Sequence, residues 1–304
     1  MISLSNVTKR FGTLTAVDNL SLEVKAGAIF GLVGPDGAGK TTTIRMITGV
    51  MAATSGQIKL LGSIDAETVK EEIGYVPQKF SLYGDLTVME NIQVMGALYG
   101  ADKKRVEELG TDILAFTNLL PFKDRLADNL SGGMKQKLAL AAGLMHRPKV
   151  FFLDEPTTGV DPVSRREFWQ MLYRLNKEGM TIFVSTPYMD EAELCSQVAF
   201  MSQGRIVACD TPERLKADYP FRLFELKAEG AQIKHVLADC PIVDINAFGD
   251  RYHLVAGDDP EVMTKVETAL RAAGIDGYSL YEISPSLEDI FVHLAEGGEP
   301  SCTP

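Results

Sequence analysis

Short apolar runs recur along the first two thirds of the chain and alternate with stretches in which apolar residues are spaced as on helices. The runs that predict strands covered on both faces lie at 28–33, 73–78, 150–155 and 179–186. Uninterrupted apolar runs of this length are typical of parallel strands buried between helices. Their alternation with helical stretches therefore predicts an α/β fold around a mostly parallel sheet.

Two further patterns interrupt this alternation. Residues 2–24 alternate between apolar and polar positions and predict short strands of an antiparallel β subdomain. These strands are expected at 2–4, 7–11 and 20–24, and the later stretch 56–62 predicts a further strand and turn. Residues 80–147 instead predict a helical subdomain, in which Thr87 and Glu90 have the spacing of a capping box and a second helix covers 103–119.

The pattern changes again near residues 218–220, where we predict a domain boundary. The first domain is expected to cover 1–218, an accessory α+β domain 219–295 and a flexible tail 296–304. The accessory domain has the order strand, helix, strand, strand, helix, strand and a further helix, which predicts a ferredoxin-like fold. Its elements are expected at 222–228, 230–239, 242–248, 251–256, 259–273, 278–284 and 286–295.

Composition limits the class of protein. With 304 residues, of which 45% are hydrophobic, the chain can bury a large core. The net charge of −11 argues against nucleic acid as a partner. No signal peptide is evident at the N-terminus, and the longest apolar run, 138–145, is far shorter than the roughly 20 residues that cross a bilayer. Scattered cysteines fit a reducing cytosol. We therefore expect a cytoplasmic protein whose contact with a membrane comes through a partner.

One stretch carries a specific motif. Residues 34–41 match the pattern of Gly, four free positions, Gly, Lys and a hydroxyl residue, between a strand and a helix. Glycines there admit left-handed backbone and let N–H groups approach phosphate oxygens, while Lys40 can bridge the terminal phosphates and Thr41 can ligate magnesium. Asp36 puts a negative charge beside this site. An ordinary glycine-rich turn would leave Lys40 and the threonines after it without a packing role. The candidate phosphate-binding residues are Gly34, Pro35, Asp36, Gly37, Ala38, Gly39, Lys40, Thr41 and Thr42.

Polar residues at the ends of two other predicted strands can join this site. Asp154 and Glu155 end an apolar run; Asp154 can hold magnesium through water, and Glu155 can orient the water that attacks a γ-phosphate. Gln78 follows another run, and its carboxamide can contact both a metal and that water.

Three further candidates each have a plain structural alternative. Phe11 stands on a predicted turn, where its ring can stack on a purine with Val17 as an apolar neighbour, or can simply pack. Ser131-Gly132-Gly133-Met134 opens a predicted helix and offers a second anion site, or an ordinary N-cap. Asp161 caps another predicted helix.

In this order along the chain, Phe11, the phosphate loop, Gln78, Leu130 to Met134, Asp154-Glu155 and Asp161 resemble the ATP-binding subunit of an ABC transporter, over residues 1 to about 215. The Leu-Ser-Gly-Gly sequence distinguishes that family from other phosphate-loop proteins. Met134 and the segment 284–291 are similar to bacterial multidrug and drug-resistance export ATPases that carry an accessory C-terminal domain.

The resemblance implies a site shared by two nucleotide-binding domains, identical or different, that face head to tail. ATP would lie between the phosphate loop of one domain and Ser131-Gly132-Gly133-Met134 with Asp161 of the other. The implied cofactors are ATP and Mg²⁺, the implied catalytic residues Glu155, Lys40 and Gln78, and the implied metal ligands Thr41, Gln78 and Asp154. The family also implies integral membrane permease subunits, contacted through residues 79–100, on the inner face of the cell membrane.

The sequence departs from the family pattern at Pro187. The family usually has a histidine after the Ser-Thr pair 185–186, where it contacts the γ-phosphate, and proline has neither a side-chain donor nor a backbone N–H. We therefore expect slow hydrolysis at the site built on this chain's phosphate loop. Asp36, where the family commonly has a neutral polar residue, adds to that expectation.

Three functions remain open at this point. The first is an ATPase subunit that energises export, and the second is a nucleotide-gated regulatory or assembly protein with little hydrolysis of its own. Pro187 favours the second, and Glu155 opposes it. The third, a soluble ABC ATPase of translation or DNA repair, usually has two cassettes or a long coiled-coil insertion, and the acidic balance gives no nucleic-acid footprint.

Overall fold

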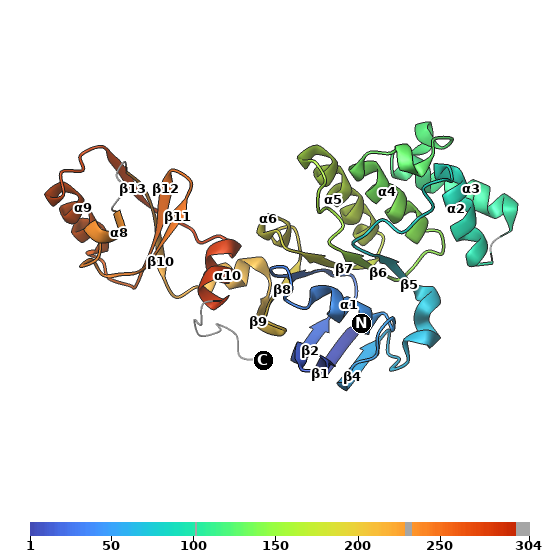
Figure 1. The fold of residues 1–304 in the computed structure, drawn as a ribbon, viewed down its shortest axis with the longest axis horizontal. Coiled ribbons are helices and arrows are strands. Elements are labelled where there is room, and N and C mark those ends of the chain that lie inside the picture. Colours follow the sequence, from blue (N-terminus) through green and yellow to red (C-terminus); the bar gives the residue numbers. More distant parts are fainter. Residues whose placement is uncertain (101, 229–232, 296–304) are drawn as a thin grey trace. The chain divides into compact units, whose positions relative to one another are not determined.

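The computed structural model describes residues 1–100, 102–228 and 233–295 (Figure 1). The chain divides into two compact units, Met1–Pro212 and Glu213–Pro304. The division precedes most of helix α7 (Pro212–Ala217), whereas the sequence placed the boundary at residue 218.

The first unit is built on a six-stranded sheet with the order β5-β6-β7-β3-β8-β9. The strands from β5 to β8 pair in parallel and only β9 is antiparallel, which confirms the predicted mostly parallel sheet. Helices α4 and α5 cover one face, and α1 lies on the other (Figure 1). The strands are β3 (Ile29–Val33), β5 (Ile73–Val76), β6 (Val150–Asp154), β7 (Thr181–Thr186), β8 (Gln197–Ser202) and β9 (Arg205–Asp210).

A three-stranded antiparallel sheet packs beneath helix α1 (Lys40–Ile47) and encloses one core with it. Its strands are β1 (Ile2–Phe11), β2 (Leu14–Val24) and β4 (Ser55–Leu60). The strands expected at 2–4 and 7–11 are therefore one strand, and β2 begins well before residue 20. The pairing of β1 with β2 shifts register between Leu4 and Val7, and Asn6 and Asn19 take positive φ angles of 51° and 50°. These bulges break the two-residue alternation on which the sequence prediction relied.

The helical segment follows β5. The predicted capping box is confirmed: Thr87 Oγ1 accepts from Glu90 N at 3.2 Å, and Glu90 Oε2 accepts from Thr87 N at 2.7 Å. The helix expected to run to residue 119 ends at Phe116, and Asn118 follows with a φ of 58°. The remaining helices of this unit are η1 (Ala66–Glu72), α2 (Val88–Leu98), α3 (Lys103–Phe116), η2 (Leu120–Phe122), η3 (Ala127–Asn129), α4 (Gly132–Gly143), α5 (Pro162–Lys177) and α6 (Met189–Ala192).

The second unit has a four-stranded antiparallel sheet with the order β11-β12-β10-β13. This order, with a helix after the first and the third strand, confirms the ferredoxin-like prediction. Apolar side chains of the sheet, α8 and α9 form its core. Parts of the helix predicted at 230–239 and the tail 296–304 lie outside the described residues. The elements are β10 (Arg222–Ala228), α8 (Ile233–Val236), β11 (Ile242–Phe248), β12 (Arg251–Ala256), α9 (Val262–Ala272), β13 (Tyr278–Ile283) and α10 (Leu287–Ala295).

Candidate functional site

The phosphate loop connects β3 to α1, as the motif predicted. Two of its glycines are required by packing, because a Cβ on Gly34 would lie 2.1 Å from Met201 O and one on Gly39 would lie 2.6 Å from Ala16 O. Gly37 has a φ of 79° and open space around its Cα, so its requirement is conformational. The loop is therefore fixed against the protein on one side and open on the other.

Lys40 begins α1, and its ammonium group bends back over the loop. Its Nζ donates to Gly34 O at 2.7 Å and to Pro35 O at 3.0 Å, and it lies 3.1 Å from Glu155 Oε1. Both partners of this ion pair are buried, with 3% and 6% of their side chains exposed. Lys40 and Glu155 thus neutralise each other beside the loop.

Glu155 is held by a second group from a distant part of the sequence. Gln78 Nε2 donates to Glu155 Oε2 at 2.9 Å, and Thr158 Oγ1 lies 3.4 Å from the same oxygen. Glu155 also has a φ of 48°, which is unusual for a residue with a side chain. The predicted catalytic residues Lys40, Gln78 and Glu155 therefore meet in one cluster.

Asp154 lies under the loop and contacts Thr41. Thr41 Oγ1 donates to Asp154 Oδ1 at 3.0 Å, and Ser185 Oγ donates to the same oxygen at 2.7 Å. The other oxygen, Oδ2, is buried and has no hydrogen-bond partner. Burial raises the pKa of Asp154 above its usual value, against the hydrogen bonds from Ser185 and Thr41. A carboxylate oxygen without a donor beside a threonine hydroxyl fits a hard cation such as magnesium.

Lys40, Thr41, Gln78 and Glu155 border a depression of about 300 Å³ at the surface of the loop. Asp36 is exposed at its edge. Gln78, Glu155 and Ala16 of β2 also line it. The depression therefore brings together residues from the phosphate loop, the end of β5 and the end of β6. The loop and helix residues that line it are Asp36, Gly37, Ala38, Gly39, Lys40, Thr41 and Thr42.

The two residues predicted to hold a base lie on the antiparallel sheet. Phe11 ends β1 at a turn, is 46% exposed, and has Lys9 Nζ at 5.1 Å from its ring centroid. Val17 is fully buried, and its Cγ2 would lie 3.4 Å from a Cβ on Gly39. Phe11 is thus partly exposed, as stacking on a base would need, while Val17 is buried next to Gly39 of the loop.

The second predicted anion site lies at the start of α4. Ser131 caps this helix by accepting from Met134 N at 3.4 Å, and both Ser131 and Gly132 are exposed. Gly133 is buried against α5, and a Cβ at this position would lie 2.6 Å from the Cβ of Ser164. Asp161 caps α5 and accepts from Ser164 N at 2.9 Å; this bond lowers the pKa of Asp161 below its usual value. These residues do not line the depression at the loop.

Sequence reasoning missed Ser185 as a site residue. It is fully buried; besides its bond to Asp154, its Oγ accepts from Glu155 N at 3.1 Å. Asp154 and Ser185 face each other in the register of β6 and β7. Such a pairing depends on which strands are neighbours, so the linear sequence gave no direct signal for it.

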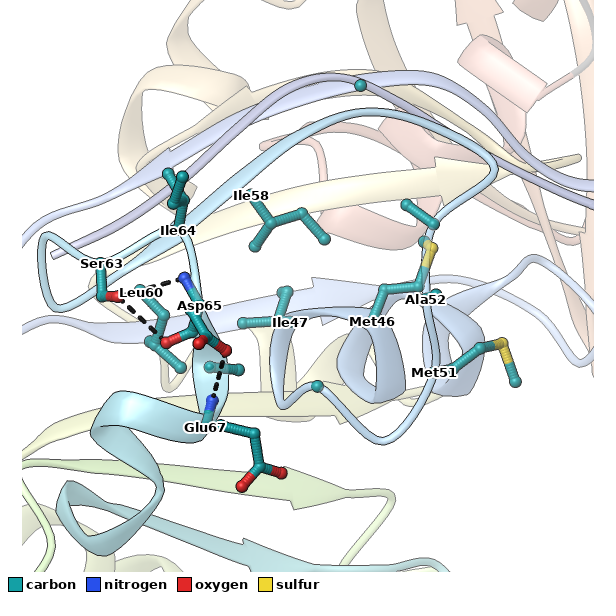
Figure 2. A pocket seen from close by; sticks show the side chains of 14 residues that line it. Met46, Ile47, Met51, Ala52, Ile58, Leu60, Ser63, Ile64, Asp65 and Glu67 are labelled. Carbon is teal, nitrogen blue, oxygen red and sulfur yellow. Dashed lines mark hydrogen bonds between the residues drawn. The ribbon is translucent and has the colours of Figure 1, made fainter.

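A separate pocket of about 420 Å³ lies between α1, β4 and the turn after β4 (Figure 2). Its apolar lining includes Met46, Ile58 and Ile64, and its polar edge is formed by Asp65, which accepts from Glu67 N at 3.1 Å. Its lining does not overlap that of the phosphate-loop depression.

A glycine loop between strand and helix, beside two adjacent carboxylates at the end of a second parallel strand of the same sheet, is typical of the phosphate-loop class of nucleotide-binding proteins. The family model described as "ABC transporter" matches residues 17–158. The linearmycin resistance ATP-binding protein LnrL of Bacillus subtilis is 33% identical, over 97% of this chain and 98% of that protein. The chain therefore belongs to the ABC transporter ATP-binding proteins.

Two other comparisons agree. The probable multidrug ABC transporter ATP-binding protein YbhF of Escherichia coli is 38% identical over 100% of this chain and 54% of that protein, so the chain spans about half the length of YbhF. A solved dimeric ATP-binding cassette, MJ0796, in a post-hydrolysis state bound to ADP and Pi, matches with a TM-score of 0.64 and 25% identity, over 69% of this chain and 98% of that one. Among the described residues, no helix is both long and apolar enough to cross a membrane.

Proposed function

We propose that this chain binds and hydrolyses ATP to energise export through a separate membrane permease. The observation that carries the proposal is the convergence of Lys40 and Gln78 on Glu155, next to the Thr41 and Asp154 pair. The relatives named for multidrug transport and linearmycin resistance support export as the direction.

Each residue of the cluster has a chemical task in this function. The backbone N–H groups of residues 37–41 and the ammonium of Lys40 bind the β- and γ-phosphates. Glu155 orients the attacking water and accepts its proton, and the carboxamide of Gln78 positions the same water. Thr41, Asp154 and Gln78 are the residues that would hold Mg²⁺, which when bound neutralises charge on the phosphates.

The chain needs a second ATP-binding domain, identical or different, to complete the site. The exposed Ser131 and Gly132 at the start of α4, with Met134, would close over the nucleotide of that second domain, and Asp161 would border it. Phe11 would stack on the adenine. Residues 79–100, which follow Gln78, would contact the permease at the inner face of the cell membrane.

A second candidate is a nucleotide-gated protein that closes on ATP and hydrolyses it slowly. Pro187 favours it, because it directly follows β7, where Thr186 O accepts from Gly34 N of the phosphate loop at 3.3 Å. A residue at this place is close to the loop, and proline offers it no donor.

Single-turnover hydrolysis by the purified full-length chain tests both candidates. If the chain is a hydrolase, wild type turns over bound MgATP and Glu155→Gln is slower by about 100-fold or more, since a general base contributes about that factor. Equal rates for these two proteins, with a faster Pro187→His variant, would favour the gated protein. Copurification from membranes in mild detergent would identify the permease and any second ATPase.

A further inference from the structure

Glu191 is a buried carboxylate that the proposed mechanism does not use. It lies in α6, directly after β7, and is fully buried, whereas 70% of the neighbouring Asp190 side chain is exposed. A buried carboxylate is costly unless donors surround it. Thr157 Oγ1 and Thr186 Oγ1 both donate to it, the latter at 2.7 Å, and Arg165 Nε lies 3.5 Å from Oε1.

The two threonine donors come from two segments next to the proposed nucleotide site, the loop after β6 and the carboxyl end of β7. Thr157 follows Glu155 on the loop that leads to Asp161. Thr186 is the last residue of β7 and directly precedes Pro187; its hydroxyl also accepts from Tyr188 N at 3.1 Å. Each oxygen of the Glu191 carboxylate therefore accepts from a different segment: Oε1 from Thr157 on the loop and Oε2 from Thr186 at the end of β7.

Arg165 supplies the compensating charge and adds a third element. It belongs to α5, the helix capped by Asp161, and its guanidinium lies 4.5 Å from the ring centroid of Tyr188. Its Nη1 also lies 3.3 Å from Asp190 Oδ2. The segment after β7 is thus attached to α5 as well as to the loop after β6.

We propose that Glu191 is a positioning residue that couples the segment 186–190 to the loop 155–161. A rigid, buried carboxylate that binds both threonines transmits a displacement of one loop to the other. The hydroxyl of Thr186 links this segment through Glu191 to Thr157 on the loop 155–161, in addition to the contacts of Arg165 with Tyr188 and Asp190. The inference rests on the proposed function, in which both segments border ATP.

Hydrogen exchange of the full-length chain without nucleotide tests the coupling directly. Thr186→Val removes the hydroxyl at nearly constant volume, and Glu191→Gln removes the charge. Each should speed exchange of the 155–161 amides by about tenfold, because local opening free energies respond to lost contacts. The double variant should be no faster than the faster single variant, since residues of one network are not additive.

Thr117→Val is the matched control. Its hydroxyl is also fully buried, but it donates to Ile113 O at 2.9 Å in the helical segment, so the 155–161 amides should keep their wild-type rates. Unchanged rates at 155–161 in folded Thr186→Val, or additive effects in the double variant, would overturn the coupling.

Kinetics separate positioning from nucleotide binding. Glu191→Gln should lower kcat about tenfold and leave the KM for MgATP within about twofold, since a displaced Glu155 affects the transition state more than binding. An exposed carboxylate at the C-terminal end of α5 provides the control, and Glu178→Gln should change neither constant. A raised KM at constant kcat would place Glu191 in binding and refute the proposal. If wild type hydrolyses no ATP, the proposed function fails, while the exchange experiment still decides the coupling.

Discussion

The ion pair between Lys40 and Glu155 makes a prediction about stability that does not depend on ATP. Lys40→Met removes the ammonium and leaves Glu155 as a buried charge, since 6% of its side chain is exposed. The single variant should therefore unfold at a lower temperature than wild type. Adding Glu155→Gln removes the uncompensated charge and should restore part of the loss.

The structure sets the size of both effects. Breaking a buried ion pair from one side costs about 3–5 kcal/mol, and we expect the lower end because Gln78 Nε2 still donates to Glu155 at 2.9 Å. For a unit such as Met1–Pro212, about 3 kcal/mol corresponds to a Tm lower by about 6–12 °C. Glu155→Gln should recover about half of this, because the bonds from Lys40 to Gly34 O and Pro35 O stay lost.

The double-mutant cycle compares wild type, Lys40→Met, Glu155→Gln and the double variant. Differential scanning calorimetry without nucleotide and with a chelator measures the Tm of each protein. Lys40→Arg is the control, because it keeps a cation next to Glu155 and should lose less stability than Lys40→Met. If the double variant melts no higher than Lys40→Met, Glu155 does not carry an uncompensated buried charge, and the reasoning from burial is wrong.

Three further predictions concern neighbouring residues. Because burial raises the pKa of Asp154, the folded chain binds the proton of this carboxyl more tightly than the unfolded chain does. The folded chain therefore loses stability as pH rises above the ordinary carboxyl value of 3.8. With a chelator present, Asp154→Asn should raise Tm at about pH 8 and much less at about pH 4. Gly37→Ala should lower the free energy of unfolding by about 1–2 kcal/mol because of the positive φ at this position. Gly34→Ala should lower it more and abolish nucleotide binding, because the added Cβ meets Met201 O. Urea unfolding measures the first effect and nucleotide titration the second. Ser185→Ala should cost about 1–3 kcal/mol in urea unfolding, since it removes two buried hydrogen bonds that each contribute about 0.5–1.5 kcal/mol. Ser185→Thr should recover part of this.

Local patterns were sufficient for the strand, loop and helix of the phosphate site, because these residues are contiguous. Gln78 and Glu155 were predicted separately, each from its place after an apolar run. Their contact follows from the pairing of β5 with β6, which brings the carboxyl ends of both strands to the same edge of the sheet. An α/β pattern therefore predicts distant contacts where parallel strands are neighbours.

The remaining features depend on register and packing. Ser185 belongs to the strand predicted at 179–186, and Glu191 follows that strand. Neither polar side chain carries a pattern that distinguishes it from an exposed one. Only the pairing of Asp154 with Ser185 and the burial of Glu191 identify their roles. The bulge in β1 was missed for a related reason, since Asn6 in the left-handed region shifts the register without changing the composition.

The partners of Lys40 explain how ATP binding and water activation can depend on each other under the proposed function. Its three donors are used by Gly34 O, Pro35 O and Glu155. When ATP is bound, a phosphate oxygen that accepts from Lys40 takes the place of Glu155, and the charge of the ammonium stays neutralised. Glu155 then loses the cation that held its Oε1, which leaves this oxygen available to accept a hydrogen bond from water. The same exchange of partners would therefore bind the γ-phosphate and release the base that acts on it.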